Sequence, residues 1–316
     1  MKKDKMKDIC EAFIKTTAEL YDIPGICIGA SMEDTRYITA AGYADINEKR
    51  TIREGDVFRC GSLAKLFTSE GIMRLEKRGR LSLEDRISDI LPDLRERFTE
   101  DKRWKDVRIV HMLTHTSGLG ETEMAWRPEE RRFRYSDKAY DILGRVISET
   151  EGRSFEDFMR TEFFDPLDME DSSFAVYLTG KETAAPYEKD RERRMVPAET
   201  ENFANGAMPS SGLASNAEDL LKWAEALMKS PAGHWRKSPY VHIPGGGDVT
   251  ETGWFLRKEG GIQAAGHEGG VRGYRACLWI MEEAKAAAVV LVNISSFPAG
   301  KTGLRLLEKL MAAAAD

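Results

Sequence analysis

The most constraining feature of this sequence is the segment 287–294, which is apolar except for Asn293. A nearly unbroken apolar run of this length is typical of a central strand that is covered on both faces. The preceding segment 274–281 is also β-like, and residues 24–44 indicate two further strands joined by a turn at Glu33–Asp34. Both ends of the chain are therefore expected to contribute strands to a sheet.

Helices are indicated where apolar residues recur three and four positions apart. Residues 6–20 have this amphipathic pattern, and the closing segment of about 301–314 has it again. Between them, the region of roughly 62–230 is mostly helical in pattern, most clearly after Tyr135 and again at about 217–229. Helices therefore flank the predicted strands and also fill the middle of the chain.

This order of elements predicts two lobes within one domain. An α/β lobe is built from both ends of the chain, about 1–61 and 240–316, and a mostly helical lobe of about 62–239 is inserted between them. A chain of 316 residues is long enough to bury a sizeable core.

Composition excludes several classes of function. The net charge of −6 provides no broad basic surface, so we expect no nucleic-acid partner. No apolar stretch approaches the roughly 20 residues that span a bilayer, so we expect no membrane partner. The basic start, Met1–Lys5, is not followed by the apolar core of a signal peptide, and a cytoplasmic location is expected.

The four cysteines are scattered along the chain, with no Cys-x-x-Cys spacing and no histidine cluster beside them. They are Cys10, Cys27, Cys60 and Cys277. This distribution predicts reduced, partly buried thiols and neither a zinc site nor a disulfide framework.

The sequence Ser62-Leu63-Ala64-Lys65 places a hydroxyl and an amine one helical turn apart on the same face. A serine hydroxyl becomes a good nucleophile when a neighbouring base takes its proton, and a lysine with a lowered pKa can be that base. The same four residues also fit a helix-capping serine followed by a solvated lysine. Partners elsewhere in the chain must decide between these interpretations.

Two other segments supply candidate partners. Tyr135 lies just before the clearest helix, where it is placed either to carry protons or to pack against the helix end. The run His267-Glu268-Gly269-Gly270 follows a strand-like segment, and glycines at a strand edge let a substrate approach the backbone. Taken alone, that run equally fits a glycine-rich turn between strands.

The order of these elements resembles the serine β-lactamase-like superfamily, which includes class C β-lactamases, penicillin-binding peptidases, esterases and D-aminopeptidases. Six blocks carry the resemblance in the family's order: 58–65, 112–119 (M-L-T-H-T-S-G-L), 133–144, 164–169, 211–220, and 267–270 with Gly273-Tyr274. They extend over nearly the whole chain. The resemblance implies an α+β fold with an antiparallel sheet, flanked by the N- and C-terminal helices, and an inserted helical lobe.

By this resemblance, Ser62 attacks a carbonyl and becomes acylated, while Lys65 and Tyr135 manage the protons. The N–H groups of Ser62 and Gly270 are expected to hold the oxyanion. His267, followed by Glu268 and Gly269, is expected at the third motif, where β-lactamases carry a lysine. No metal or organic cofactor is implied. The second block, which contains His115, is interpreted as structural.

Two positions depart from the family pattern. Asp137 stands where the family usually has Asn, and its charge favours a protonated Lys65, which would give Tyr135 more of the base's role. Glu268 stands where the family often has a Thr or Ser that binds a substrate carboxylate, so a carboxylate there would repel such a substrate. Both are therefore expected to bind substrate groups that are neutral or carry an amine.

The leading prediction is a cytoplasmic serine hydrolase that cleaves esters or amides of small molecules or short peptides. An acyltransferase on the same scaffold is an enzymatic alternative. A non-catalytic acyl-binding or sensory homologue is an alternative from another class. β-Lactamase or D-Ala-D-Ala carboxypeptidase activity is disfavoured, because those substrates carry a carboxylate and those enzymes are normally exported.

Overall fold

The computed structural model of the chain describes residues 1–97, 105–119, 130, 132–174, 182–199, 208–230 and 239–315. Its centre is a nine-stranded antiparallel sheet with the order β3-β2-β1-β13-β12-β11-β10-β9-β8. The strands are β1 (Gly25–Met32), β2 (Thr35–Asp45), β3 (Arg50–Thr51), β8 (Pro239–His242), β9 (Asp248–Thr250), β10 (Phe255–Glu259), β11 (Ile262–Val271), β12 (Tyr274–Met281) and β13 (Ala286–Val292). The predicted antiparallel sheet, made from both ends of the chain, is confirmed.

Strand β13 is central, as its apolar sequence predicts, because it pairs with β1 on one side and with β12 on the other. Every residue of β13 is buried. Its side chains alternate between two cores, so that Val289 and Leu291 pack in one and Val290 and Val292 in the other. The sheet is thus covered on both faces.

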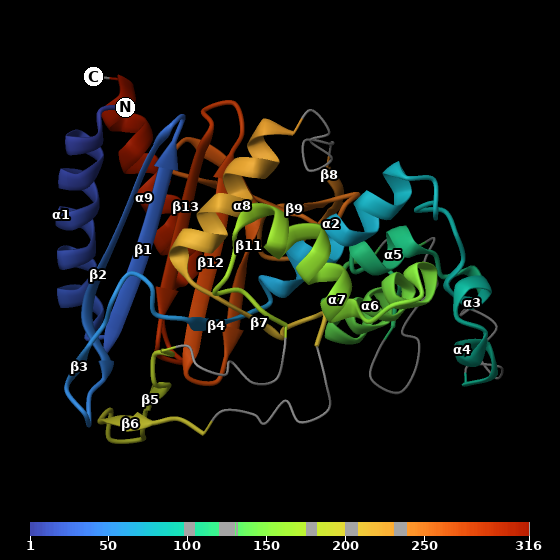
Figure 1. Cartoon of the computed structure of the whole chain (residues 1–316), viewed down its shortest axis with the longest axis horizontal. Helices are drawn as coiled ribbons and strands as arrows, with labels where there is room; N and C mark the ends of the chain where they lie inside the picture. The colour runs from blue at the N-terminus through green and yellow to red at the C-terminus, as the bar shows by residue number, and fades with distance from the viewer. Residues whose placement is uncertain are drawn as a thin grey trace.

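The helices of the two chain ends cover one face of the sheet. These are α1 (Lys3–Tyr21), which packs on β2, and α9 (Ala299–Ala315), which packs on β12 and β13. Figure 1 shows both at the left of the molecule, with the two termini close together. Both helices were predicted from sequence, although α9 begins slightly earlier than expected.

The opposite face of the sheet carries α8 (Ala217–Lys229), which packs on β1 and β13, and beside it lies the group of helices seen at the right of Figure 1. These are α2 (Ala64–Lys77), α3 (Ile87–Ile90), α4 (Pro92–Arg97), α5 (Ile109–Leu113), α6 (Asp137–Glu151) and α7 (Phe155–Met159), followed by a π-helical turn (Arg160–Phe164) and a 3-10 turn (Asp165–Leu167). The described residues also form two short strand pairs: β4 (Phe58–Gly61) with β7 (Leu213–Ser215), and β5 (Tyr187–Lys189) with β6 (Met195–Pro197). Part of the segment 62–239, namely α8, therefore packs directly on the sheet.

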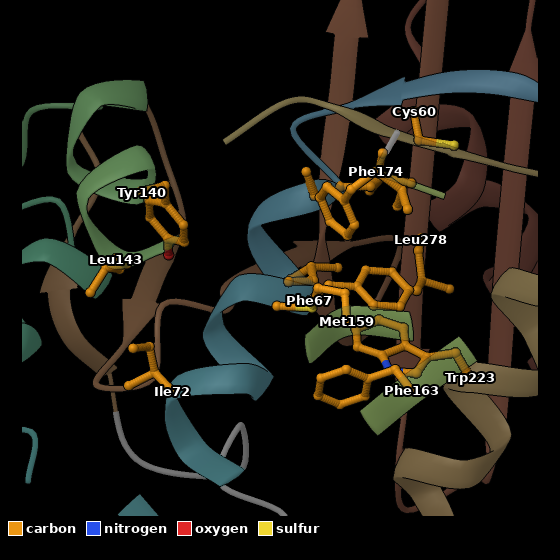
Figure 2. Packing of buried hydrophobic residues seen from close by; sticks show 14 of the residues in the cluster. Cys60, Phe67, Ile72, Tyr140, Leu143, Met159, Phe163, Phe174, Trp223 and Leu278 are labelled. Atoms are coloured by element: carbon orange, nitrogen blue, oxygen red, sulfur yellow. The ribbon is translucent and has the colours of Figure 1, made fainter. Parts of the chain in front are cut away.

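Helix α2 is held on both sides by buried side chains. Phe67 stacks on Trp223 of α8, with ring centroids 3.9 Å apart, and its edge meets Phe163. Figure 2 shows these rings on one side of α2 and Ile72 directed to the other side, toward Leu143 of α6. Because interiors are close-packed, this contact set fixes the position of α2 and of the side chains near its N-terminus.

Among the helices that the structure describes, none has the length and apolar character of a membrane-spanning segment.

Candidate active site

Ser62 lies in the turn between β4 and α2, and glycines of β4 and β11 let the two backbones approach closely beside it. Gly61 has a φ of 53°, and a Cβ there would lie 2.7 Å from the nitrogen of Gly270. A Cβ on Gly269 would lie 1.9 Å from the carbonyl oxygen of Cys60. The glycine run therefore lies inside strand β11 and packs backbone against backbone beside Ser62, rather than forming a turn between strands. The assignment of the Ser62 and Gly270 N–H groups to an oxyanion hole remains a prediction.

The three residues expected to do the chemistry meet at one oxygen. Lys65 Nζ lies 3.1 Å from Ser62 Oγ, and the hydroxyl of Tyr135 donates to the same Oγ at 2.8 Å. Lys65 Nζ also lies over the ring of Tyr135, 4.8 Å from its centroid. The structure therefore brings together the hydroxyl of the turn before α2, the amine of α2 and the phenol of the loop before α6.

Lys65 is only 1% exposed, and two further acceptors hold its side chain. Nζ donates to Oδ1 of Asp137 at 2.6 Å and to the carbonyl of Ser210 at 2.7 Å. The Ser210 backbone is fixed in turn, because its N–H donates to Asp141 of α6 and Thr68 of α2 donates to the preceding carbonyl, that of Pro209. The amine is thus directed at Ser62 by groups from three separate parts of the chain.

Burial shifts the pKa values of Lys65 and Tyr135 in opposite directions. Loss of solvation lowers the pKa of Lys65, and this effect outweighs the opposing attraction of Asp137. Loss of solvation is also the main cause that raises the pKa of Tyr135, although 39% of that side chain is exposed. The amine is therefore the easier of the two to deprotonate, and the phenol is the group that retains its proton.

His267 lies on the site-facing side of β11 and is 3% exposed. The centroid of its ring lies 4.3 Å from that of Phe255 and 6.0 Å from that of Tyr135. Burial, reinforced by the charge of Lys65, lowers its pKa to about 3, so the ring is neutral. Nδ1 pairs with the carbonyl oxygen of Glu268, which only accepts, so Nδ1 carries the proton and Nε2 is an acceptor without a partner among the described residues.

The two departures from the family pattern lie in different places. Asp137 begins α6, is 60% exposed and contacts Lys65, so it belongs to the site. Glu268 pairs across the sheet with Cys277, which packs in the core beneath α9, and its carboxylate lies against Gly300 of that helix. Because strand side chains alternate between faces, Glu268 points away from the face that His267 presents to Tyr135. Glu268 was expected to contact substrate, but the structure places it at the N-terminus of α9.

Sequence reasoning treated His115 as structural, but the structure places it directly beside the catalytic candidates. The residue is 1% exposed, and its ring stacks on that of Tyr135 with centroids 4.5 Å apart. His115 has a positive φ of 57°, which is uncommon for a residue other than glycine and is not visible in the sequence. Within the described part of the chain, no three His, Cys, Asp or Glu side chains are grouped to hold a metal ion.

Known proteins are similar in sequence to most of this chain. A family model described as Beta-lactamase matches residues 11–311. Penicillin-binding protein 4* of Bacillus subtilis (strain 168) is 26% identical over 87% of this chain and 68% of its own length. A β-lactamase of Escherichia coli (strain K12) is 24% identical over 71% of this chain and 62% of its own length. The chain thus spans about two thirds of these curated relatives.

Solved structures show the same fold. The octameric penicillin-binding protein homologue from Pyrococcus abyssi has a TM-score of 0.82 and 24% identity, covering 99% of this chain and 78% of that chain. The D-amino acid amidase from Ochrobactrum anthropi SV3, complexed with L-phenylalanine amide, has a TM-score of 0.80 and 20% identity, covering 97% of this chain and 99% of that chain.

Proposed function

The chain belongs to the β-lactamase family, and we propose that it is a serine hydrolase that forms an acyl-enzyme on Ser62. The proposed substrates are esters or amides of small molecules or short peptides. The observation that carries the proposal is the convergence of Lys65 Nζ and the Tyr135 hydroxyl on Ser62 Oγ, at 3.1 and 2.8 Å. A nucleophile within hydrogen-bond distance of a base is the arrangement that covalent catalysis needs.

In the proposed acylation, neutral Lys65 accepts the proton of Ser62 as Oγ bonds to the substrate carbonyl carbon. The lowered pKa of Lys65 supports this role, and the raised pKa of Tyr135 supports a phenol that donates. Tyr135 then gives its proton to the departing alkoxide or amine, and Lys65 restores the proton of Tyr135. Water cleaves the acyl-enzyme by the reverse route. This division of roles differs from the one that the charge of Asp137 suggested from sequence.

The polar groups facing this site support substrates with a hydrogen-bond donor or an amine near the reacting carbonyl. The exposed carboxylate of Asp137 accepts hydrogen bonds, and the neutral, buried ring of His267 stands where β-lactamases carry a cationic lysine. A substrate carboxylate would be repelled by the carboxylate of Asp137, which lies 2.6 Å from Lys65 Nζ. The structural likeness to a D-amino acid amidase is consistent with amino-acid amides as one candidate class.

A serine-directed fluorophosphonate probe tests the acyl-enzyme proposal. Wild-type protein should be labelled on Ser62, as located by mass spectrometry, and Ser62→Ala should show no labelling. Gly55→Ala serves as a control, because a Cβ there meets no atom within 4 Å. Equal labelling of wild type and Ser62→Ala would refute the proposal, as would no labelling of the wild type.

Matched substrates test the substrate class. We expect kcat/KM to be higher for amino-acid amides and methyl esters than for the same compounds ending in a free carboxylate. A preference for the carboxylate form would contradict the proposal. Adding an alcohol or amine nucleophile to the same assays measures acyl transfer, and a product dominated by transfer would identify an acyltransferase instead.

A further inference from the structure

The two residues that flank Tyr135 are both bound to His115. The carbonyl of His115 accepts the N–H of Arg134 at 2.9 Å, and its Nδ1 accepts the N–H of Ser136 at 3.2 Å. Between these two hydrogen bonds, the imidazole and phenol rings stack at an interplanar angle of 27°. The side chain and the backbone carbonyl of His115 thus contact three consecutive residues, Arg134, Tyr135 and Ser136.

His115 adopts a conformation that few non-glycine residues adopt. Its φ is 57°, in the turn that follows α5, and such backbone is retained when surrounding contacts compensate for its cost. Here the conformation directs the carbonyl to Arg134 and the ring to Ser136. The strain at this position therefore accompanies a specific set of contacts to the loop that carries Tyr135.

The ring of His115 is set to accept and not to transfer protons. Because Ser136 donates to Nδ1, that nitrogen carries no proton, and the neutral ring is protonated at Nε2. Burial lowers the pKa of His115 well below its ordinary value, and the nearby charge of Lys65 acts in the same direction. Nε2 of His115 has no hydrogen-bond partner among the described residues, and the ring meets the reacting groups through its stack on Tyr135.

We propose that His115 is a positioning residue that holds the phenol of Tyr135 against Ser62 Oγ. This inference rests on the proposed acyl-enzyme function and assigns a role within it to the histidine of the M-L-T-H-T-S-G-L block. The ring stack and the Nδ1 acceptor make separate contributions. His115→Phe keeps an aromatic ring and removes the acceptor. His115→Asn removes the ring, offers an amide oxygen as acceptor, and uses a residue that tolerates positive φ.

A double-mutant cycle with Tyr135→Phe separates positioning from a general structural role. Single-turnover acylation by an amino-acid amide should be slowed about 10²-fold by His115→Phe, since small misplacements of reacting groups have effects of that size. In the Tyr135→Phe background, the same change should alter the rate by less than about twofold, because the hydroxyl that His115 positions is already absent. Equal losses in both backgrounds would overturn the proposal.

His111→Asn is the matched control. His111 lies four residues earlier, and its Nδ1 also accepts a backbone N–H, that of Arg108 at 3.1 Å. It should lower the melting temperature without coupling to Tyr135. If His115→Phe fails to fold, the cycle is run with His115→Asn. Fluorophosphonate labelling of wild-type Ser62 distinguishes failure of the positioning role from failure of the proposed acyl-enzyme function. A labelled wild type with an additive cycle refutes the positioning role alone.

Discussion

The side-chain nitrogen of Lys65 lies 2.6 Å from Oδ1 of Asp137, and this ion pair joins a buried group to an exposed one. Lys65 is 1% exposed and Asp137 is 60% exposed. Solvent screens the carboxylate while the amine is removed from water, so attraction by Asp137 only partly offsets the desolvation of Lys65. The attraction of Asp137 therefore raises the pKa of Lys65 by less than burial lowers it.

Asp137→Asn should move the acidic limb of the pH–rate profile to lower pH. The carboxylate raises the pKa of Lys65 against the lowering by burial, so its removal lowers that pKa further and keeps the amine neutral in more acidic solution. The measurement is kcat/KM against pH for an uncharged ester. Asp141→Asn should shift the limb in the same direction but less, because Asp141 attracts Lys65 less strongly than Asp137 does. An unmoved limb in Asp137→Asn would count against Lys65 as the base.

Gly269→Ala should reduce kcat by about 10²–10³-fold, the range seen when an oxyanion donor is lost. A Cβ at position 269 would lie 1.9 Å from the Cys60 carbonyl, so β11 must move away from the turn that carries Ser62. Gly55→Ala is the control, because it adds a methyl group in open space. Unchanged kcat in Gly269→Ala would show that the close approach of β11 to this turn is not needed for catalysis.

The sequence alone predicted the central strand, the terminal helices and the residues that meet at Ser62, because each depends on a local pattern or on a motif. It did not reveal the face on which Glu268 lies, since that depends on the register between β11 and β12. The role of His115 was also out of reach. Its partners lie about 20 residues away, and its backbone conformation is a property of the packed turn.

Glu268→Gln should leave substrate selectivity nearly unchanged, in contrast to Asp137→Asn. Glu268 lies on the α9 side of the sheet, where its carboxylate faces the positive end of that helix. Its loss should lower the free energy of unfolding by about 0.3–1 kcal/mol. The readouts are urea unfolding and the ratio of kcat/KM for amide-ended and carboxylate-ended substrates. If Glu268→Gln changes that ratio more than Asp137→Asn does, Glu268 acts on the substrate after all.

The buried His267 should make the fold sensitive to acid. Its pKa is about 3 in the folded chain and 6.5 without burial, so between these values the unfolded chain binds a proton that the folded chain does not. The free energy of unfolding should therefore fall as the pH drops from about 6.5 toward 3, by at most about 1.4 kcal/mol per pH unit from this group. The lowered pKa of His115 acts in the same direction.

Urea unfolding of wild type and His267→Gln from pH 4 to 7 measures this contribution. The variant should lose part of the wild-type slope while retaining the share that comes from His115. His242→Gln is the comparison variant, because that ring is 71% exposed and lies 3.0 Å from Asp248 at the surface. A slope that is unchanged in His267→Gln would mean that His267 is protonated in the folded state. The neutral ring of His267, on which the proposed substrate class partly rests, would then be wrong as well.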